Sequence, residues 1–541
     1  MRREIDRMVA LCLIVSACAS GGCGTSGEKP ACRFEQPFPY SSDSPYLGVH
    51  GNRENNDRIF CPGPAEGVER SWAALAGRMV VQPVAFSADG NTIYATVMRT
   101  EGCRLYAVDR KSGKEIWCSE HFTVGVAGSS VESDEDGYLY LTDGGNASTV
   151  YSLHPEDGSV RWRTSLAGLF SGTGSVYHAP LGLHFTPDGY LATVTPDGVV
   201  VLLDRSDGRV LTHFDIQSEL GFVPPPRAEI PMELVPQYVF DRYRQVIGEM
   251  SEDEFAVLIN GTLGGSGSFS DNTIAVSALN QLFVVGGGPT TEQGSLVALN
   301  VVAGTPDPHL ELAWYVTLAP GSATSPALSR DGTRVVVGDG TSGLLYIDVE
   351  ACNDNTDSDP HAEFCAPLWS YPLLGGKSLG SVSLDENGVV YAWHSSSEAK
   401  DPDLFALGNA GGQPELLWQH CFADGDINAQ WTSSATVTDN LVIGTVSFLE
   451  GTMSGPLSGL PFYENLTHEL VAVDRFSGEV VWRTAADDDS VNSPAIGPDG
   501  AIYLPIMGTL DLLSTASETH YQGGIVRYVP EMGEDATIDT R

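Results

Sequence analysis

The sequence predicts an all-β protein, a single eight-bladed β-propeller with four strands in each blade. Three observations lead to this prediction: a phrase that repeats along the chain, hairpin turns upstream of it, and tryptophans at matching positions. The composition agrees with many tight turns, since the 541 residues include 60 Gly and 32 Pro and only 18% are charged. One large repeat architecture accounts for this length without several separate domains.

The repeated phrase consists of an apolar strand, a turn and a second strand that ends in tryptophan. Residues 105–117 have the sequence Leu-Tyr-Ala-Val-Asp-Arg-Lys-Ser-Gly-Lys-Glu-Ile-Trp, and residues 150–162 and 470–482 follow the same pattern. A glycine stands four residues after a polar residue, where a tight turn favours it. Each phrase therefore predicts one β-hairpin.

A second hairpin signal precedes these phrases. Asp-Gly or Asn-Gly between apolar runs is the strongest short-range hairpin signal. It occurs at Asp89-Gly90, Asp136-Gly137, Asp188-Gly189, Asp331-Gly332, Asn387-Gly388 and Asp499-Gly500. Two hairpins give each unit four strands, and we count eight units, beginning near residues 79, 129, 178, 271, 322, 378, 431 and 490.

Tryptophans recur at the end of the phrase, and we interpret them as structural. A packed Trp buries roughly 150–250 Å², so it can fasten neighbouring blades. We expect this role, and no catalytic one, for Trp72, Trp117, Trp162, Trp314, Trp369, Trp418 and Trp482, with Thr212 replacing Trp in the third unit.

Unit eight lacks a final strand of its own, and the N-terminal part of the chain supplies a candidate. Residues 67–73 are similar to the Trp-ending strands, so we expect them to close the ring as the outer strand of blade eight. Closure removes a free sheet edge. An insertion at 218–270 separates blades three and four, and it is predicted to contain short helices at 236–249 and 251–259.

The N-terminus has the pattern of a secretory signal. Three arginines precede an apolar run at 8–17 that is too short to span a bilayer. Small residues before Cys18 resemble a bacterial lipobox, which predicts a signal peptide over 1–17, a lipidated Cys18 and a flexible tether over 18–45. Ala19 favours the outer membrane in lipoproteins of this kind. An ordinary signal peptide with an incidental cysteine is the alternative.

The cysteines agree with an oxidising compartment. We predict disulfides within two hairpins and one before the folded body. The pairs are Cys103–Cys118, Cys352–Cys365 and Cys32–Cys61, while Cys23 and Cys421 have no assigned partner.

The charge excludes some partners. The chain has 70 acidic and 29 basic residues, a net charge of −41, and residues 531–541 form an acidic tail. Nucleic acid needs a basic face, and an anionic membrane would repel this protein, so only a lipid anchor is expected to touch the membrane.

The repeated phrase resembles the tryptophan-docking repeat of quinoprotein-type propellers, and residues 46–56 resemble the lead-in of such domains. The resemblance covers about 46–530 and implies the fold. The family includes pyrroloquinoline-quinone (PQQ) dehydrogenases and non-enzymatic lipoproteins, among them the scaffold of the outer-membrane β-barrel assembly machinery.

The resemblance and the motifs argue against an enzyme. Such dehydrogenases use a vicinal disulfide, a Ca²⁺ ion and an Asp base, and this sequence has no adjacent Cys pair. PQQ is therefore not expected. Calcium is the candidate ligand of the acidic loop between Cys352 and Cys365, through the oxygen-bearing side chains of Asp354, Asp357 and Asp359. A solvated acidic turn is the alternative.

The insertions indicate which face is functional. Those at 218–270, 447–468 and 507–522 are predicted on one face, and those at 303–312 and 351–366 on the other. Because binding often uses loops elaborated on a rigid scaffold, we predict a monomeric, non-catalytic lipoprotein of the outer membrane that docks another envelope protein through the first face. A quinone- or calcium-dependent dehydrogenase and a surface glycan- or ligand-binding propeller are the alternatives.

Overall fold

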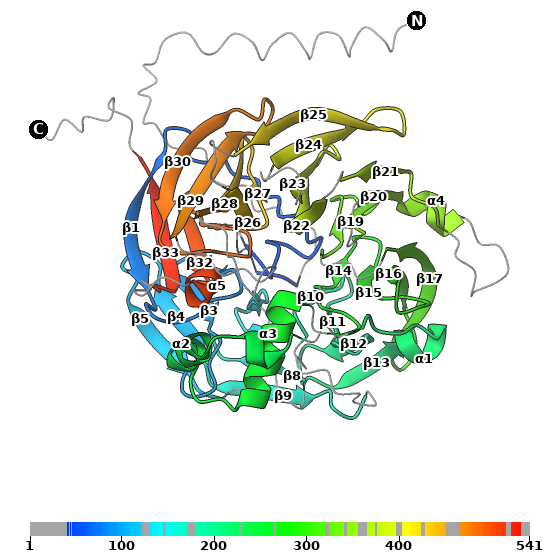
Figure 1. Ribbon diagram of the computed structural model, residues 1–541. Coiled ribbons are helices and arrows are strands. Elements are labelled where there is room, and N and C mark those ends of the chain that lie inside the picture. Colours follow the sequence, from blue (N-terminus) through cyan, green and yellow to red (C-terminus); the bar gives the residue numbers. More distant parts are fainter. Residues whose placement is uncertain are drawn as a thin grey trace, which may run out of the picture. The chain divides into compact units, whose positions relative to one another are not determined.

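Eight antiparallel sheets follow one another around a ring in the computed structural model, which confirms the predicted eight-bladed propeller (Figure 1). The ring lies within Cys32–Arg541, a single structural unit. The structure describes residues 40–531 apart from 43, 45, 122–129, 144–147, 170–179, 227–229, 265–266, 320–323, 340–342, 355–364, 374–375, 397–402, 423–427, 451–464 and 515–520.

Blades 1 to 4 each contain four strands, which follow one another in sequence order from the axis outward. Blade 1 contains β2 (Ala85–Phe86), β3 (Thr92–Thr96), β4 (Leu105–Asp109) and β5 (Glu115–Ser119). Blade 2 contains β6 (Glu132–Ser133), β7 (Leu139–Asp143), β8 (Thr149–Leu153) and β9 (Val160–Ser165). Blade 3 contains β10 (Leu183–Phe185), β11 (Tyr190–Val194), β12 (Val199–Asp204) and β13 (Val210–Asp215). Blade 4 contains β14 (Ala275–Val276), β15 (Gln281–Gly287), β16 (Gly294–Val302) and β17 (His309–Leu318).

Blades 5 to 8 follow the same plan, except that blade 7 divides its innermost position between two short strands. Blade 5 contains β18 (Ala327–Leu328), β19 (Arg334–Gly338), β20 (Gly343–Asp348) and β21 (Trp369–Pro372). Blade 6 contains β22 (Gly376–Leu384), β23 (Val390–Ser396), β24 (Asp403–Asn409) and β25 (Pro414–Cys421). Blade 7 contains β26 (Asn428–Thr432) and β27 (Thr436–Val437), which both pair with β28 (Leu441–Glu450), then β29 (Asn465–Asp474) and β30 (Val480–Ala486). Blade 8 contains β31 (Ala495–Ile496), β32 (Ile502–Ile506), β33 (Gly524–Pro530) and β1 (Val68–Ala74).

Blade 8 joins the two ends of the propeller sequence. β1 pairs antiparallel with β33, with Val68 opposite Pro530 and Ala74 opposite Ile525. The predicted closure by an N-terminal strand is therefore confirmed. Because β33 would otherwise be an open edge, this pairing completes the ring.

The docking tryptophans pack on turn glycines of the next blade. Trp117 of β5 covers Gly158 in the β8–β9 turn, where a Cβ on the glycine would stand 2.5 Å from a ring carbon. The indole nitrogen of Trp117 also donates a hydrogen bond to the carbonyl of Pro155 at 3.0 Å. Matching pairs of contacts join Trp72, Trp162 and Trp418 to the turns of blades 1, 3 and 7. The missing side chain of each glycine thus makes room for the indole.

The remaining three tryptophans make contacts of other kinds. The indole nitrogen of Trp482 donates to the carbonyl of Pro64 at 2.6 Å, and that of Trp314 donates to Oδ1 of Asn353 at 2.9 Å. Trp369 stacks on Tyr346 with ring centroids 4.6 Å apart. All seven predicted tryptophans therefore pack within the ring.

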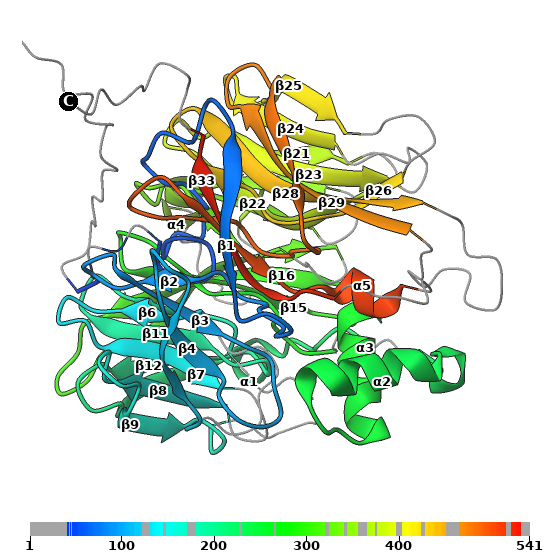
Figure 2. The ribbon, with the colours of Figure 1, turned by 90° about the vertical axis from the view of Figure 1, so that its left-hand side faces the viewer.

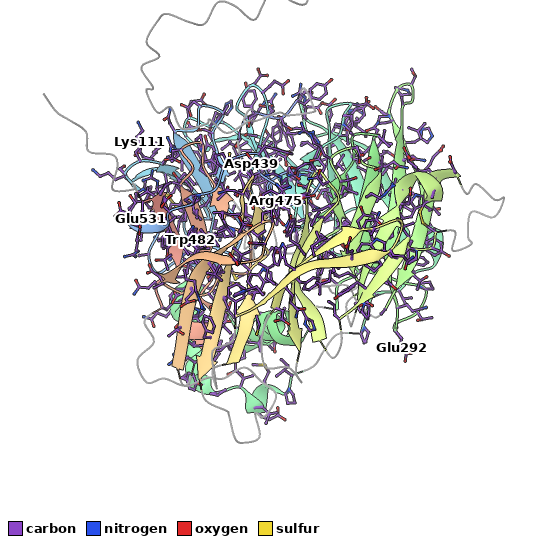
Figure 3. All side chains as sticks on the ribbon, turned by 90° about the horizontal axis from the view of Figure 1, so that it is seen from above. Lys111, Glu292, Asp439, Arg475, Trp482 and Glu531 are labelled. Carbon is purple, nitrogen blue, oxygen red and sulfur yellow. A yellow bond between two sulfur atoms is a disulfide. The ribbon has the colours of Figure 1, made fainter. Side chains whose placement is uncertain are left out.

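An arginine in the repeated phrase adds an ionic contact between blades. Arg475 follows Asp474 of β29, and its guanidinium donates to Oδ2 of Asp385 at 2.6 Å and to the Tyr391 hydroxyl at 3.2 Å in blade 6. Its backbone N–H donates to the carbonyl of Asn440 at 2.9 Å. Figure 3 labels Arg475 and also Asp439, the residue before Asn440. Arg110 and Arg205 occupy the same position in their phrases and pair with Asp499 and Asp134 of the preceding blades.

The insertion between blades 3 and 4 is helical, as predicted. It contains α1 (Ile216–Leu220), the 3-10 helix η1 (Met232–Leu234), α2 (Gln237–Ile247) and α3 (Glu252–Gly264). Two further short helices are α4 (Val349–Asp354), between β20 and β21, and α5 (Thr509–Leu513), between β32 and β33. Val239, Tyr243 and Ile247 form the buried stripe of α2, at the spacing of one helix face.

Two of the predicted disulfides are present, joining Cys103 to Cys118 and Cys352 to Cys365. Cys61 is also disulfide-bonded, and the predicted partner Cys32 lies outside the described residues. Cys421 is exposed at the end of β25.

The folded body begins earlier than the predicted end of the tether at residue 45. The N–H of Ser42 donates to the carbonyl of Ser133 at 2.9 Å, and Arg205 lies over the ring of Tyr40 at 4.6 Å. Ser42 thus pairs with the free edge of β6, the innermost strand of blade 2. The polar composition of residues 18–45 did not indicate this contact. The predicted signal peptide, Cys18, Cys23 and residues 532–541 lie outside the described residues.

Replacing Gly158 by alanine is expected to destabilise the propeller more than the same change at Gly500. Both glycines have a left-handed backbone, with φ of 68° and 72°. Only Gly158 has an indole within contact of the added Cβ, and no atom lies within 4 Å at Gly500. Overpacking costs about 1–3 kcal/mol beyond the shared backbone strain. Denaturant unfolding of both variants measures this difference, and equal losses would contradict the docking role.

Replacing Arg475 by alanine is expected to cost about 3–5 kcal/mol of folding free energy, because it leaves a buried carboxylate without its cation. Asp385 has a side-chain exposure of 2%. The matched control is Arg70→Ala, which breaks an exposed pair with Asp487 (2.6 Å) and should cost roughly 0–1 kcal/mol. If denaturation curves of the two variants coincide, the interblade clamp has no energetic role.

Candidate functional site

Residues 46–59 form an axial segment that passes through the centre of the ring (blue in Figure 1). The segment accepts one backbone hydrogen bond from each innermost strand of blades 4 to 7. In each case a strand N–H donates to a carbonyl of the segment. The pairs are Val276 to Arg53 (2.8 Å), Leu328 to Glu54 (2.8 Å), Leu384 to Asn56 (3.0 Å) and Val437 to Asp57 (2.8 Å). The chain therefore satisfies strand edges that would otherwise face the axis.

Asn55 links the axial segment to blades 3 and 4. Its amide nitrogen donates to the carbonyl of Ile274 at 3.0 Å, and its side-chain oxygen lies 3.2 Å from Nε2 of His184. The other ring nitrogen of His184 pairs with Glu132 at 3.0 Å. Asn55 has φ of 54°, a left-handed conformation that asparagine tolerates better than most residues. These polar groups form one buried network between the segment and the ring.

Asp57 makes the corresponding link to blade 8. Its carboxylate lies 2.9 Å from Nδ1 of His50 and accepts a 2.5 Å hydrogen bond from the Ser493 hydroxyl. Burial, and secondly the charge of Asp57, raise the pKa of Tyr46 well above its ordinary value. Asp57, like Glu132, is thus paired with side chains of the protein itself.

The described axis residues do not present a set that fits a quinone and its Ca²⁺ ion. Glu132 is held by His184, and Asp57 is held by His50 and Ser493. The left-handed Gly48 is packed so closely that a Cβ would stand 2.6 Å from the His184 ring. We therefore derive no quinone chemistry from this part of the molecule.

A second polar region lies on the face that carries the long insertions, which we call the loop-rich face. Figure 2 shows α2, α3 and α5 together on this side of the ring. One apolar cluster joins them, and it includes Tyr243 of α2, Phe255 of α3 and Leu512 of α5. Met79 and Met98 of the first blade belong to the same cluster. Insertions that are far apart in sequence therefore form one helical platform, made of α2, α3 and α5.

A histidine and three aspartates lie beside this platform. His468 belongs to β29, Asp488 and Asp489 to the connection between β30 and β31, and Asp511 to α5. One ligand atom from each of His468, Asp488 and Asp511 lies within 4.8 Å of the others. We call these four residues the His–Asp cluster.

The carboxyl groups of the His–Asp cluster lie close together and are largely buried. If all three were ionised, their negative charges would exceed the positive charge beside them. Burial raises the pKa of Asp489 to about 6. Burial, and then the neighbouring Asp511, raise the pKa of Asp488 well above its ordinary value. Carboxyl groups in this state hold a proton or a cation more readily than exposed ones.

Of the metal-binding residues predicted from the sequence, the structure describes Asp354, which does not belong to this cluster. Asp354 ends α4 in blade 5, and Asp357 and Asp359 lie outside the described residues. Calcium binding in that loop therefore stays a prediction. The His–Asp cluster carries no local motif, because its residues come from three separate segments. His468 lies on the third strand of blade 7, Asp488 and Asp489 follow the fourth strand of that blade, and Asp511 follows the second strand of blade 8, so the fold alone brings them together.

The Asp-Arg pairs of the repeated phrase also make contacts between blades that the sequence analysis did not predict. They stand at 109–110, 204–205 and 474–475, next to the turns that receive Trp72, Trp162 and Trp418. Their recurrence was the available signal, and it indicates a structural clamp between blades.

Sequence comparison agrees with the predicted resemblance. Residues 101–219 match the family described as "Outer membrane protein assembly factor BamB". This match covers blades 2 and 3 and the outer two strands of blade 1, which is less than half of the chain. No curated protein sequence matches the chain significantly. Among the described residues, no helix has both the length and the apolar character needed to cross a membrane.

Solved structures of two dehydrogenases share the fold at low sequence identity. The quinohemoprotein alcohol dehydrogenase from Comamonas testosteroni has a TM-score of 0.52 and 12% identity, covering 92% of this chain and 82% of that one. A europium-containing methanol dehydrogenase has a TM-score of 0.53 and 12% identity, covering 91% and 98%. BamB from Moraxella catarrhalis aligns with a TM-score of 0.46 and 10% identity, covering 85% and 99%. The chain is thus an eight-bladed β-propeller that shares its fold with these two dehydrogenases and resembles the BamB family in sequence over residues 101–219.

Proposed function

We propose that this protein is a non-catalytic scaffold of the bacterial envelope that docks another protein through its loop-rich face. The helical platform is the observation that carries the proposal. Three helices from two insertions share one apolar cluster and are set on a closed ring. A rigid support with an elaborated face is the usual arrangement of a binding surface.

The outer side of the platform is available for a partner. In α2, the buried stripe leaves Gln237, Asp241 and Gln245 exposed at intervals of four residues. The first turn of α3 adds the exposed acidic residues Glu252, Asp253 and Glu254. A partner with basic and polar groups would suit this surface, in keeping with the net charge of −41.

Two further observations favour a scaffold over a dehydrogenase. The axial segment occupies the described part of the ring centre with its own hydrogen bonds. The match over residues 101–219 is to an outer-membrane assembly factor. Assembly of outer-membrane proteins is therefore the process in which we propose that this scaffold acts, as a monomer. A quinone-dependent dehydrogenase is the second candidate, and cross-linking in cells separates the two.

A photo-reactive amino acid at Gln245 is expected to cross-link to an envelope protein in intact cells. The matched control is the same substitution at Asp207, an exposed residue in the β12–β13 turn of blade 3. Mass spectrometry identifies the adducts. A discrete adduct at Gln245 that is absent at Asp207 supports docking through the loop-rich face.

The proposal fails if position 245 gives no adduct, or if both positions give the same adducts. Dye reduction by the purified chain with added PQQ and a primary alcohol would then support the dehydrogenase. Both measurements use the full chain, so misfolding of a fragment cannot imitate either result.

We also propose that Cys18 carries the lipid that anchors the protein to the outer membrane. Cys18→Ser is expected to move the protein from the membrane fraction to the soluble fraction, because the anchor supplies the membrane affinity. Cys23→Ser is the control, since Cys23 lies five residues further on, outside the predicted lipobox. Fractionation followed by immunoblotting measures the change. Retention of the Cys18→Ser protein in membranes would contradict lipid anchoring.

A further inference from the structure

The His–Asp cluster joins three segments that are distant in the chain. Its histidine is in blade 7, two aspartates are in the connection to blade 8, and the third is in α5. His468 has a side-chain exposure of 5% and Asp511 of 16%. Asp489 is completely buried. Such a concentration of acidic groups away from water needs protons or a cation to balance it.

The histidine is oriented toward the carboxylates. Its Nδ1 atom lies 2.8 Å from the Ser447 hydroxyl, and its Nε2 atom lies 3.2 Å from Oδ2 of Asp511. With the proton on Nδ1, donated to Ser447, the lone pair of Nε2 faces the aspartates. A hydrogen bond to the far nitrogen is the contact that fixes a metal-binding imidazole in other proteins.

Polar atoms of the cluster lack hydrogen-bond partners within the described residues. They include Nε2 of His468, whose contact with Asp511 does not have hydrogen-bond geometry, and Oδ2 of Asp489. The hydroxyl of Thr509, at the start of α5, is also buried and has no hydrogen-bond partner among the described residues. Unsatisfied buried atoms of this kind are uncommon, and a bound water molecule or ion would satisfy them.

The backbone holds the aspartates in place for such a ligand. Oδ2 of Asp488 accepts hydrogen bonds from the N–H groups of Gln522 and Gly523 at 2.7 and 3.0 Å. Oδ1 of Asp489 accepts one from the N–H of Leu510 at 2.8 Å. The positive charge of Arg242 also reaches Asp511, while its guanidinium donates to the carbonyl of Ser514. One oxygen of each of Asp488 and Asp489 is thereby fixed by the backbone.

We propose that His468, Asp488 and Asp511 bind a divalent transition-metal ion such as Zn²⁺, with Asp489 as an additional or outer carboxylate. An imidazole together with carboxylates suits Zn²⁺, whereas Ca²⁺ requires six to eight oxygens. A tetrahedral ion with bonds of about 2.0–2.2 Å holds its ligand atoms about 3.3–3.6 Å apart. The 4.8 Å spread of the three ligand atoms therefore needs only small side-chain rotations.

The metal would have a structural effect on the loop-rich face. It would join β29 and the β30–β31 connection to α5, whose Leu512 and Leu513 pack in the same apolar cluster as α2 and α3. The inference does not depend on the scaffold function, because metal binding is measured without any partner.

The test uses the full chain, without a histidine tag, after treatment with EDTA and dialysis. Zn²⁺ and Ca²⁺ are titrated separately by calorimetry in about 150 mM salt, the ionic strength of cells, and thermal unfolding is recorded with and without each ion. We expect one Zn²⁺ site that raises the melting temperature and binds Ca²⁺ at least tenfold more weakly. His468→Gln and Asp511→Asn are expected to weaken Zn²⁺ binding by a factor of ten or more.

His309→Gln is the matched control, because His309 forms an exposed pair with Glu311 (2.8 Å) far from the cluster in sequence. Its Zn²⁺ affinity should equal that of the unmodified chain. If His468→Gln does not fold, as judged by circular dichroism, Ser447→Ala decides the question, since loss of such an outer partner weakens metal binding about 10–100-fold. The proposal is overturned if the unmodified chain has no Zn²⁺-dependent melting shift, or if the cluster variants bind Zn²⁺ as well as His309→Gln does.

Discussion

The pairing of β1 with β33 is the constraint on which the rest of the structure depends. A ring of sheets is complete only when its last blade has an outer strand, and in this protein that strand comes from Val68–Ala74, far from β33 in sequence. The chain before β1 must then start elsewhere in the ring, and it runs through the axis as residues 46–59. Closure also places Pro64 where its carbonyl accepts the hydrogen bond of the Trp482 indole. The last docking tryptophan is thus satisfied by the segment that closes the ring.

Between blades, the same short phrase supplies both an apolar and an ionic contact. Its tryptophan covers a glycine of the next blade, as Trp418 covers Gly478. Its arginine reaches back to the preceding blade, as Arg475 reaches Asp385. The carbonyl of that arginine also accepts the indole hydrogen bond, at 2.9 Å in this pair. Three contacts therefore converge on one turn, which explains why variation in the turn changes how the tryptophan docks, as at Trp314.

Local patterns were sufficient to predict the blades and the helical insertion, because these depend on hairpin turns, alternation and helical spacing within a few residues. Closure of the ring was predictable because residues 67–73 are similar to the Trp-ending strands of the other units. The axial segment was recognised only as a lead-in, since its fit depends on strand edges from blades 4 to 7 that no local pattern describes. Tyr40 was assigned to the tether for the same reason, although it packs against Arg205. The His–Asp cluster could not be predicted either: His468 and Asp511 have no common motif, and the fold alone brings them to 3.2 Å.

The loop-rich face combines a rigid ring with parts that the ring does not itself determine. The strands of each blade are fixed on both sides by neighbouring blades, whereas α2 and α3 are held mainly by the apolar cluster they share with α5. α5 has only five residues, too few to be stable as a helix without tertiary contacts. Its position therefore depends on the groups around it, among them Asp489, which binds the N–H of Leu510. Because Asp489 and Asp511 belong to the His–Asp cluster, the charge state and ligand of that cluster act directly on the helix that supports the platform.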